Sequence, residues 1–384
     1  MKKEMTAHNT THSQQDTGSV DSDLSADSQA IGASTGRRSF IKKSGAAGLA
    51  LAAPALWIPK ARAANALTVA DNGGALQPAL RAAFYDPFEK ETGIHINNIA
   101  HESDPVTQFK LSVDSGSHMW DVGMVTPDNV YRLAQPKNYL APLGIASSDA
   151  KDILPGMLTD NWFGFSVYGV IMGYRTDKFA KGGPNSWADF WDVAQFPGRR
   201  GMYRSPSGTL ENALLADGVA AKDLYPINVD RAFKSLDKIH KSVAVWWSNG
   251  AQNTQILQSG EVDMTDTWNS RALAAVASGA PVKLVWQGTY SVDGWSIPAG
   301  TPNLKEAQQF VRFCMRADRQ AVYASMASNG PSNSKAIAMI DPAKAAILTT
   351  NPKNLERMVR RDSNWWGKNF DATNERFQDW LLGA

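Results

Sequence analysis

Cysteine is almost absent from the 384-residue chain, which contains a single thiol, Cys314. One cysteine excludes an internal disulfide. Cys314 lies in a stretch where Leu304, Ala307 and Val311 recur at helical spacing, and no histidine is near it in the sequence. We therefore expect a buried structural thiol rather than a reactive one.

Catalytic and metal-binding fingerprints are also missing. The six histidines show no HExxH or other metal-ligand spacing. The chain has no GxSxG, GxGxxG or P-loop motif, and no serine or cysteine nucleophile with an adjacent base is visible. These absences argue against an enzyme, a metal and a cofactor, and an exported enzyme is kept only as the minor alternative.

The chain lacks both a strong charge imbalance and a long apolar run. It carries 39 basic and 37 acidic residues. Residues 1–63 hold eight of the basic and five of the acidic ones, which leaves 31 basic and 32 acidic residues in the remaining 321. This balance gives no sign of a nucleic-acid or membrane-surface partner. No apolar run reaches the roughly 20 residues that a membrane-spanning helix needs.

The N-terminal segment has the layout of an export signal. The first 36 residues are polar, and we expect them to be disordered. A basic stretch with the adjacent pair Arg37 and Arg38 follows, then an apolar run at 45–58 and the small-x-small tripeptide ending at Ala63. The stretch RRSFIK closely resembles a twin-arginine signal. The resemblance implies export by the twin-arginine translocase, cleavage after Ala63 and a periplasmic location.

The mature length and the alternation of strand-like and helix-like stretches predict an α/β protein with two lobes. Helices are expected over 76–93, with an interruption near Pro87, and over 229–241 and 270–279. The strands are expected at 66–71, 94–100, 120–126, 262–268 and 282–286, and an apolar run at 166–177 precedes a turn.

Five segments resemble the extracellular solute-binding proteins of ABC importers, in the order found in that family: EKETGIHI, MWDVGMVT, NSWADFWD, SGEVDMTDTWNS and SVDGWSIPAGTPNLKEAQQFVRF. The resemblance is greatest to the spermidine/putrescine-binding branch. It implies a two-lobed periplasmic binding fold of type II, with a ligand cleft between lobes joined by two crossing strands. The crossings are expected near 168–169 and 293–297, with lobe 1 formed by 64–168 and 297–384 and lobe 2 by 169–296.

The resemblance also implies partners. A protein of this kind is a monomer that captures a small solute, closes by hinge motion, and delivers it to a membrane permease served by a cytoplasmic ATPase. It needs no cofactor. Iron-binding relatives of this fold use a tyrosine pair, and no adjacent tyrosines occur here.

Matching to the family one residue at a time predicts a ligand site. Asp293 matches an aspartate that pairs with a ligand amine in the polyamine branch, and Trp268 matches a pocket tryptophan. Two positions before Asp293 the family has a pocket aromatic where this chain has Ser291, so the neighbouring Tyr290 is a candidate substitute. The further candidates are Asn269, Thr126, Tyr168 and Asn72.

Trp246 and Trp247 stand side by side, so in a strand they point to opposite faces. We expect Trp247 to face the ligand, because an indole face attracts an ammonium group, and Trp246 to pack in the core. Asp266 shares the face of Trp268 in a strand and would add a negative charge, although an aspartate near a strand end more often faces solvent.

The segment RSPSGTLENAL, residues 204–214, leaves the ligand class open. The polyamine branch places two acidic residues where this chain has Ser205 and Gly208, and an unpaired buried ammonium is expensive. Ser205, Ser207 and Gly208 precede a helix, where free N–H groups favour an anion, although the turn also serves as a plain helix cap. The ligand is then a polyamine such as putrescine or spermidine, or instead an opine, an amino-acid derivative or a thiamine-like solute.

Overall fold

The computed structural model describes residues 66–102, 104–179 and 182–383. The twin-arginine pair Arg37–Arg38 and the expected cleavage point after Ala63 lie outside the described residues. None of the helices in the described part of the chain combines the length and the apolarity that a membrane crossing requires.

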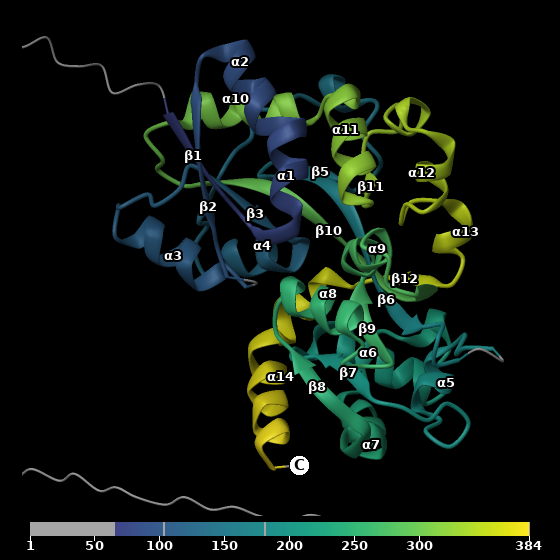
Figure 1. Cartoon of the computed structure of the whole chain (residues 1–384). Helices are drawn as coiled ribbons and strands as arrows, with labels where there is room; N and C mark the ends of the chain where they lie inside the picture. The colour runs from purple at the N-terminus through teal and green to yellow at the C-terminus, as the bar shows by residue number, and fades with distance from the viewer. Residues whose placement is uncertain (1–65, 103, 180–181, 384) are drawn as a thin grey trace, which may run out of the picture. The chain divides into compact units, whose positions relative to one another are not determined.

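Strands and helices alternate along the chain (Figure 1). The first group is β1 (Ala66–Asp71), η1 (Gly74–Leu76), α1 (Gln77–Leu80), η2 (Arg81–Tyr85), α2 (Asp86–Thr92), β2 (His95–Ala100), α3 (Val106–Asp114), β3 (Val122–Val125), α4 (Pro127–Leu133), β4 (Leu140–Ala141), η3 (Ser147–Ala150) and β5 (Leu158–Thr159). The second is β6 (Trp162–Arg175), α5 (Trp187–Trp191), β7 (Arg200–Tyr203), α6 (Pro206–Ala216), η4 (Ala221–Asp223), α7 (Val229–Ile239), η5 (His240–Ser242), β8 (Val243–Trp247), α8 (Gly250–Ser259), β9 (Met264–Trp268), α9 (Asn269–Ala277) and β10 (Val282–Pro298). The last is α10 (Leu304–Cys314), α11 (Ala317–Ala327), β11 (Gly330–Pro331), η6 (Ile337–Met339), α12 (Pro342–Ala346), α13 (Pro352–Leu355), β12 (Met358–Arg360) and α14 (Ser363–Gly383).

The expected helix over 76–93 is present as consecutive helical segments of different types, α1, η2 and α2. A π-helical turn, η2, interrupts it just before Pro87, which then occupies the first turn of α2, where proline is tolerated. The helix ends at Gly93, whose φ of 71° is the left-handed conformation that glycine adopts readily. The predicted interruption and end are therefore both present.

The described strands belong to one mixed sheet, with the main order β2-β1-β3-β10-β6-β9-β7-β8. β6 and β10 are the longest strands and pair antiparallel along most of their length. The other neighbours of β6 change between Val167, which faces β11, and Val170, which faces β9. This change brackets residues 168–169, where a crossing was expected.

In β10 the corresponding change comes slightly earlier than 293–297. β12 pairs with Gly288–Tyr290, and β3 pairs from Gly294 onward. Asp293 therefore lies at the change itself, opposite Ser166 of β6. The two long strands thus carry residues 168 and 293 into the middle of the sheet, where its two halves meet.

Each half of the sheet has its own apolar core. Around β1 and β3 the core is built from Phe84, Phe88, Trp295 and Phe310, with the buried Cys314 among them as expected. Around β7 and β9 it is built from a second set of buried side chains, which includes Trp187, Phe190, Met202, Leu236 and Met264.

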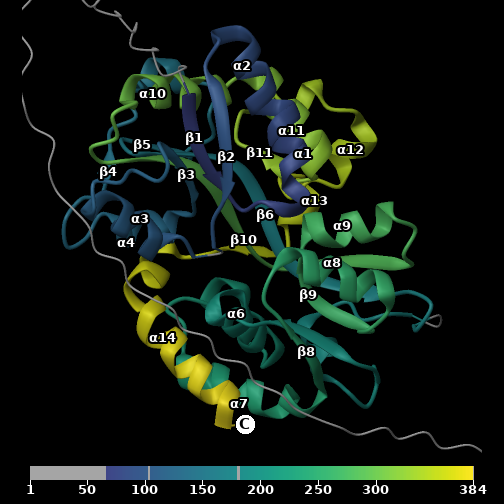
Figure 2. The ribbon, with the colours of Figure 1, turned by 60° about the vertical axis from the view of Figure 1, so that its left-hand side comes forward.

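The C-terminal helix α14 departs from the expected division into lobes. Its residues Trp366 and Phe377 belong to the second core, where Phe377 lies near Phe233 of α7. Figures 1 and 2 show α14 running beside α6 and α7, with its first turns close to α4. Residues 363–383 therefore pack with residues 169–296, although they were expected in lobe 1.

Candidate ligand-binding site

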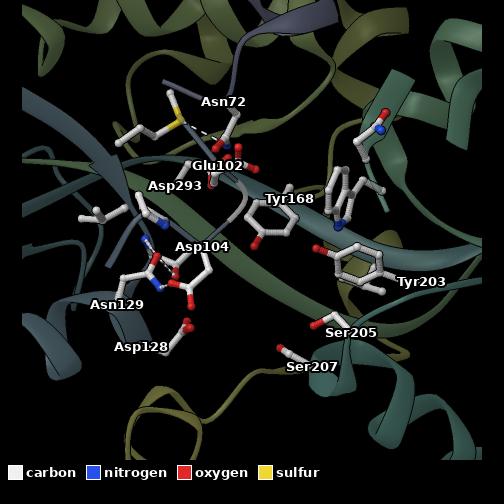
Figure 3. Close-up of a pocket in the computed structure, with 18 of the residues that line it drawn as sticks. Asn72, Glu102, Asp104, Asp128, Asn129, Tyr168, Tyr203, Ser205, Ser207 and Asp293 are labelled. Carbon is white, nitrogen blue, oxygen red and sulfur yellow. Dashed lines mark hydrogen bonds between the residues drawn. The ribbon is translucent and has the colours of Figure 1, made fainter. Parts of the chain in front are cut away.

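A cavity of about 480 Å³ opens where the two halves of the sheet meet (Figure 3). This volume is within the range of small-molecule sites. Its wall combines segments that are far apart in the sequence: the ends of β1 and β3, the start of α4, the middle of β6 and β10, the loops that begin α6, α8 and α9, and α14. The charged residues that line it are Glu102, Asp104, Asp128, Arg204, Arg271, Asp293 and Arg361, together with His101.

The cavity brings together seven of the ten residues expected to bind ligand. These are Asn72, Thr126, Tyr168, Ser205, Ser207, Trp268 and Asp293. The other three, Trp247, Asn269 and Tyr290, are not among its lining residues. Their side chains are used elsewhere, for reasons that differ in each case.

Trp247 lies behind the wall rather than in it. Its ring is fully buried and stacks on the ring of Tyr203, with the centroids 4.4 Å apart. Trp268 meets both rings edge-on, at 5.2 Å and 5.4 Å. Tyr203 and Trp268 line the cavity, so Trp247 supports the aromatic wall from behind. Trp246 points the opposite way, as strand geometry requires, and packs near Phe377 and Trp380.

Asp266 is buried behind the same wall and faces neither the ligand nor the solvent. Its carboxylate accepts hydrogen bonds from the Trp247 indole at 2.8 Å and from the Tyr203 backbone N–H at 3.1 Å. Burial raises the pKa of Asp266 to about 7, against the effect of these two hydrogen bonds. Asp266 thus orients the aromatic wall instead of supplying a charge to the cavity.

Asn269 and Tyr290 have structural roles. The Asn269 amide is fully buried, accepts from the Gly169 N–H at 2.8 Å and donates to the Ser328 carbonyl at 2.7 Å. Tyr290 packs beside a third apolar cluster, and its carbonyl accepts from the Arg361 N–H at 3.0 Å. Tyr290 therefore affects the site by positioning Arg361.

The turn at 205–208 does not offer all of its backbone N–H groups to an anion. Gly208 has a φ of 91°, so regular helix begins only after it. Its N–H donates to the Glu211 carboxylate at 2.8 Å, and Glu211 also accepts from Tyr225 and Trp366. The interpretation of this turn as a backbone anion site is therefore wrong at Gly208, where a side-chain cap is present.

Asp293 is a buried carboxylate whose oxygens face the cavity. Its side chain is 6 % exposed, and within residues 66–102, 104–179 and 182–383 it has no hydrogen-bond partner. Burial raises the pKa of Asp293 to about 7, although the charges of Arg361 and Arg271 lower it. An incoming ammonium group would supply the missing partner.

Arg271, which sequence reasoning missed, is the corresponding cation. Its side chain lines the cavity, is 5 % exposed and has no described hydrogen-bond or ion-pair partner. It lies over the Trp268 ring at 6.0 Å and so close to Gly250 that a Cβ there would fall 2.4 Å from Nε. Arg271 is in the first turn of α9, where the helix dipole disfavours a cation. That unfavourable placement was the signal in the sequence by which Arg271 could have been singled out.

Arg361 was also missed, and unlike Arg271 it is held by the protein. It donates to Ser207 Oγ at 2.9 Å, Ser291 Oγ at 3.0 Å and Tyr168 Oη at 3.2 Å, and lies 3.4 Å from Asp128. Burial lowers its pKa, but the charges of Asp128 and Glu211 raise it above its usual value. Burial in turn raises the pKa of Tyr168 to about 12, so that phenol is neutral.

Part of the remaining polar wall is internally bonded. Thr126 donates to the Asn129 amide oxygen at 2.9 Å, and Asp104 accepts from Arg132 at 2.8 Å. Asn72 contacts the Met124 sulfur at 3.5 Å. Figure 3 shows Asp104, Asp128 and Asn129 on one side of the cavity, with Tyr203, Ser205 and Ser207 on the other.

The described residues contain no group of three or more His, Cys, Asp or Glu side chains placed to hold a metal ion. What the cavity offers is one unpaired buried carboxylate and one unpaired buried guanidinium, beside an aromatic wall. Both groups are costly to bury without a polar partner, so each is available to make a charged contact with a bound solute.

An α/β fold of the periplasmic binding type, with a charged cavity between the halves of its sheet, defines a solute-binding protein. The chain belongs to the bacterial extracellular solute-binding protein family, which matches residues 83–350. Proteins of this family bind small molecules for ABC importers, together with membrane permease and ATPase components, and are not enzymes.

Three relatives carry different ligand names. A gamma-aminobutyric acid-binding protein of Pseudomonas aeruginosa is 34 % identical over 323 residues, covering 82 % of this chain and 91 % of the relative. The PBP AgtB of A. tumefaciens R10, solved in complex with agropinic acid, has a TM-score of 0.75 and 28 % identity, covering 83 % of this chain and 98 % of AgtB. A spermidine/putrescine-binding periplasmic protein of Haemophilus influenzae is 25 % identical over 243 residues, covering 60 % of this chain and 66 % of the relative.

The comparisons confirm the family and refine the expected branch. The chain is more similar to the gamma-aminobutyric acid-binding relative than to the spermidine/putrescine-binding one, both in identity and in coverage. The twin-arginine route is not addressed by these similarities and stays a prediction.

Proposed function

We propose that this protein captures a small solute with an ammonium group at one end and a carboxylate at the other, and delivers it to an ABC permease. Asp293 receives the ammonium group and Arg271 the carboxylate, while Tyr203 and Trp268 flank the chain between them. The observation that carries the proposal is the pair of oppositely charged, buried and unpartnered side chains lining one cavity.

4-Aminobutyrate is the simplest solute of this class, and the similarity to a gamma-aminobutyric acid-binding protein supports it. An opine-type amino acid derivative is the second candidate, because the cavity volume leaves room for a larger carboxylated amine and because AgtB was solved with agropinic acid. A polyamine fits less well, since the cavity contains two buried arginines as well as its acidic residues.

Isothermal titration of the mature protein tests this assignment with 4-aminobutyrate, butylamine, butyrate, putrescine and agropinic acid. Each charged hydrogen bond left unmade costs about 1.5–3 kcal/mol. Butylamine and butyrate should therefore bind roughly 10- to 100-fold more weakly than the solute that carries both groups.

Asp293→Asn and Arg271→Met should each lower the affinity for 4-aminobutyrate by a similar factor, while Asp230→Asn, an exposed carboxylate on α7, should not. Tight binding of putrescine with none of the carboxylated amines would contradict the proposal. So would full affinity in both cavity variants.

We further propose that the chain reaches the periplasm by the twin-arginine route and acts there as a monomer, with a hinge at the crossings near 168–169 and 293. The adjacent Arg37 and Arg38 before an apolar run support the route. Replacing both arginines by lysine should leave an uncleaved precursor in the cytoplasm. Normal export of that variant would show that the arginine pair is not the signal.

A further inference from the structure

Arg361 is placed in the cavity by a short strand. β12 pairs in parallel with β10, and the Arg361 N–H donates to the Tyr290 carbonyl at 3.0 Å directly after that strand. The side chain then runs into the cavity with 8 % of its surface exposed. Its guanidinium is met by hydroxyls from three elements: Ser207 of α6, Tyr168 of β6 and Ser291 of β10.

The same guanidinium is the described cationic partner of Asp128. Asp128 is 7 % exposed, and among the described residues its carboxylate forms its one ion pair with Arg361, at 3.4 Å. Arg361 is also the charge that lowers the pKa of Asp293 most. The cavity thus contains two buried carboxylates that both sense Arg361, and one of them is already paired.

We propose that Arg361 is a specificity-determining residue, a built-in cation that restricts the cavity to ligands with one ammonium group. This inference rests on the proposed function. A diamine brings two ammonium groups to a cavity with one unpaired buried carboxylate, so the second ammonium finds no second buried carboxylate that is unpaired; Glu102 and Asp104 line the cavity at more exposed positions. Two fixed guanidinium groups add like-charge repulsion.

Removal of Arg361 should reverse this preference. Asp128 loses its partner, and the hydroxyls of Ser207, Tyr168 and Ser291 are freed to accept hydrogen bonds. An ammonium group has three N–H donors, which this acceptor cluster satisfies. Without the Arg361 guanidinium, the cavity should therefore bind the second ammonium group of a diamine more tightly.

The test is a titration of Arg361→Met with putrescine at pH 8, with 4-aminobutyrate and butylamine as further probes. Putrescine matches 4-aminobutyrate in length and replaces its carboxylate by an aminomethyl group. Arg361→Met should bind putrescine at least tenfold more tightly than the wild type. Arg361→Met/Asp128→Asn should lose that gain, because the freed carboxylate is gone. Arg360→Met, an exposed arginine on the same strand, is the matched control and should behave as the wild type.

A folded Arg361→Met protein with unchanged putrescine affinity overturns the proposal, as does a gain that survives Asp128→Asn. The comparison of putrescine affinity between the single and double variants does not require 4-aminobutyrate to bind. A failure of this inference about Arg361 is therefore distinguishable from a failure of the proposed function. Should Arg361→Met not fold, Asp128→Asn alone decides: it leaves the guanidinium uncompensated and should weaken butylamine binding roughly tenfold. Unchanged butylamine affinity in that variant also overturns the proposal.

Discussion

At the scale of single residues, Asp293 is the group whose chemistry depends most on pH. Its pKa of about 7 means that it is partly protonated near neutrality. Only the ionised form pairs with an ammonium group, while an aliphatic amine and a carboxylate keep their charges between pH 5.5 and 8.5. Affinity should therefore fall by roughly tenfold between pH 8 and pH 6. Titration calorimetry across this range checks the prediction, and a flat profile would contradict it.

The same raised pKa carries a cost in stability. The pKa of this carboxyl is higher in the folded than in the unfolded protein. The free energy of unfolding of the protein therefore falls as pH rises from about 4 to about 7. A shift of this size corresponds to at most roughly 4 kcal/mol above pH 7. Asp293→Asn should accordingly raise the melting temperature at pH 8 and have little effect at pH 5, while it removes the stabilisation by ligand. A lower melting temperature at pH 8 would show that Asp293 is a structural residue.

Several of the residues that the sequence predicts to bind ligand lie on strands or directly after them. Asp293, Trp268 and Thr126 line the cavity because strand direction fixes where such side chains go. Trp247 has the predicted orientation relative to Trp246, but Tyr203 of the neighbouring strand lies in front of it. The spacing of residues within one strand does not show which side chain of an adjacent strand lies between it and the cavity.

Arg271 and Arg361 were not predicted from the sequence, for a different reason. Arg361 is indistinguishable from the adjacent Arg360 until the three-residue strand β12 pairs with β10. This pairing joins residues about 70 positions apart, so local pattern carries no trace of it. Arg271 was detectable in principle, because a cation in the first turn of a helix opposes the helix dipole.

At the scale of elements, α14 is the part of the fold that differs most from expectation. Residues 363–383 were assigned by the order of the family pattern, whereas the helix packs through Phe377 against the second core. It also supplies Phe370 and Asn374 to the cavity wall, and Arg132 of α4 pairs with its Asp371 at 2.7 Å. The helix therefore touches both halves of the site.

Phe377→Ala should destabilise the protein strongly. The ring is fully buried and lies near Phe233, Trp246 and Trp380, and truncation of a buried phenylalanine costs about 3–5 kcal/mol. Urea denaturation followed by tryptophan fluorescence measures the change in free energy of unfolding. Leu382→Ala, at an 81 % exposed position of the same helix, is the control and should change it by less than about 0.5 kcal/mol. Equal stabilities of the two variants would show that α14 does not contribute to the core.

At the scale of the whole molecule, the class of fold followed from the sequence and its resemblance, but the ligand did not. The two long strands β6 and β10 pair antiparallel through the middle of the sheet, and the crossings near 168–169 and 293 stay a prediction. Which ligand the cavity suits depends on its buried polar and charged side chains. These come from β6, β10, α4, α9 and the segment after β12, which are far apart in the sequence. The lack of acidic residues at positions 205 and 208 left both a polyamine and a carboxylated amine open, and the structure adds the buried guanidinium groups of Arg271 and Arg361 to the cavity wall.

The most direct measurement of the central claim is a crystal structure of the mature protein with 4-aminobutyrate. The account predicts the ligand nitrogen within hydrogen-bond distance of the Asp293 carboxylate, and the ligand carboxylate on the Arg271 guanidinium, with Tyr203 and Trp268 against the carbon chain. A ligand bound outside the cavity, or inside it with its amine away from Asp293 and its carboxylate away from Arg271, would contradict the account.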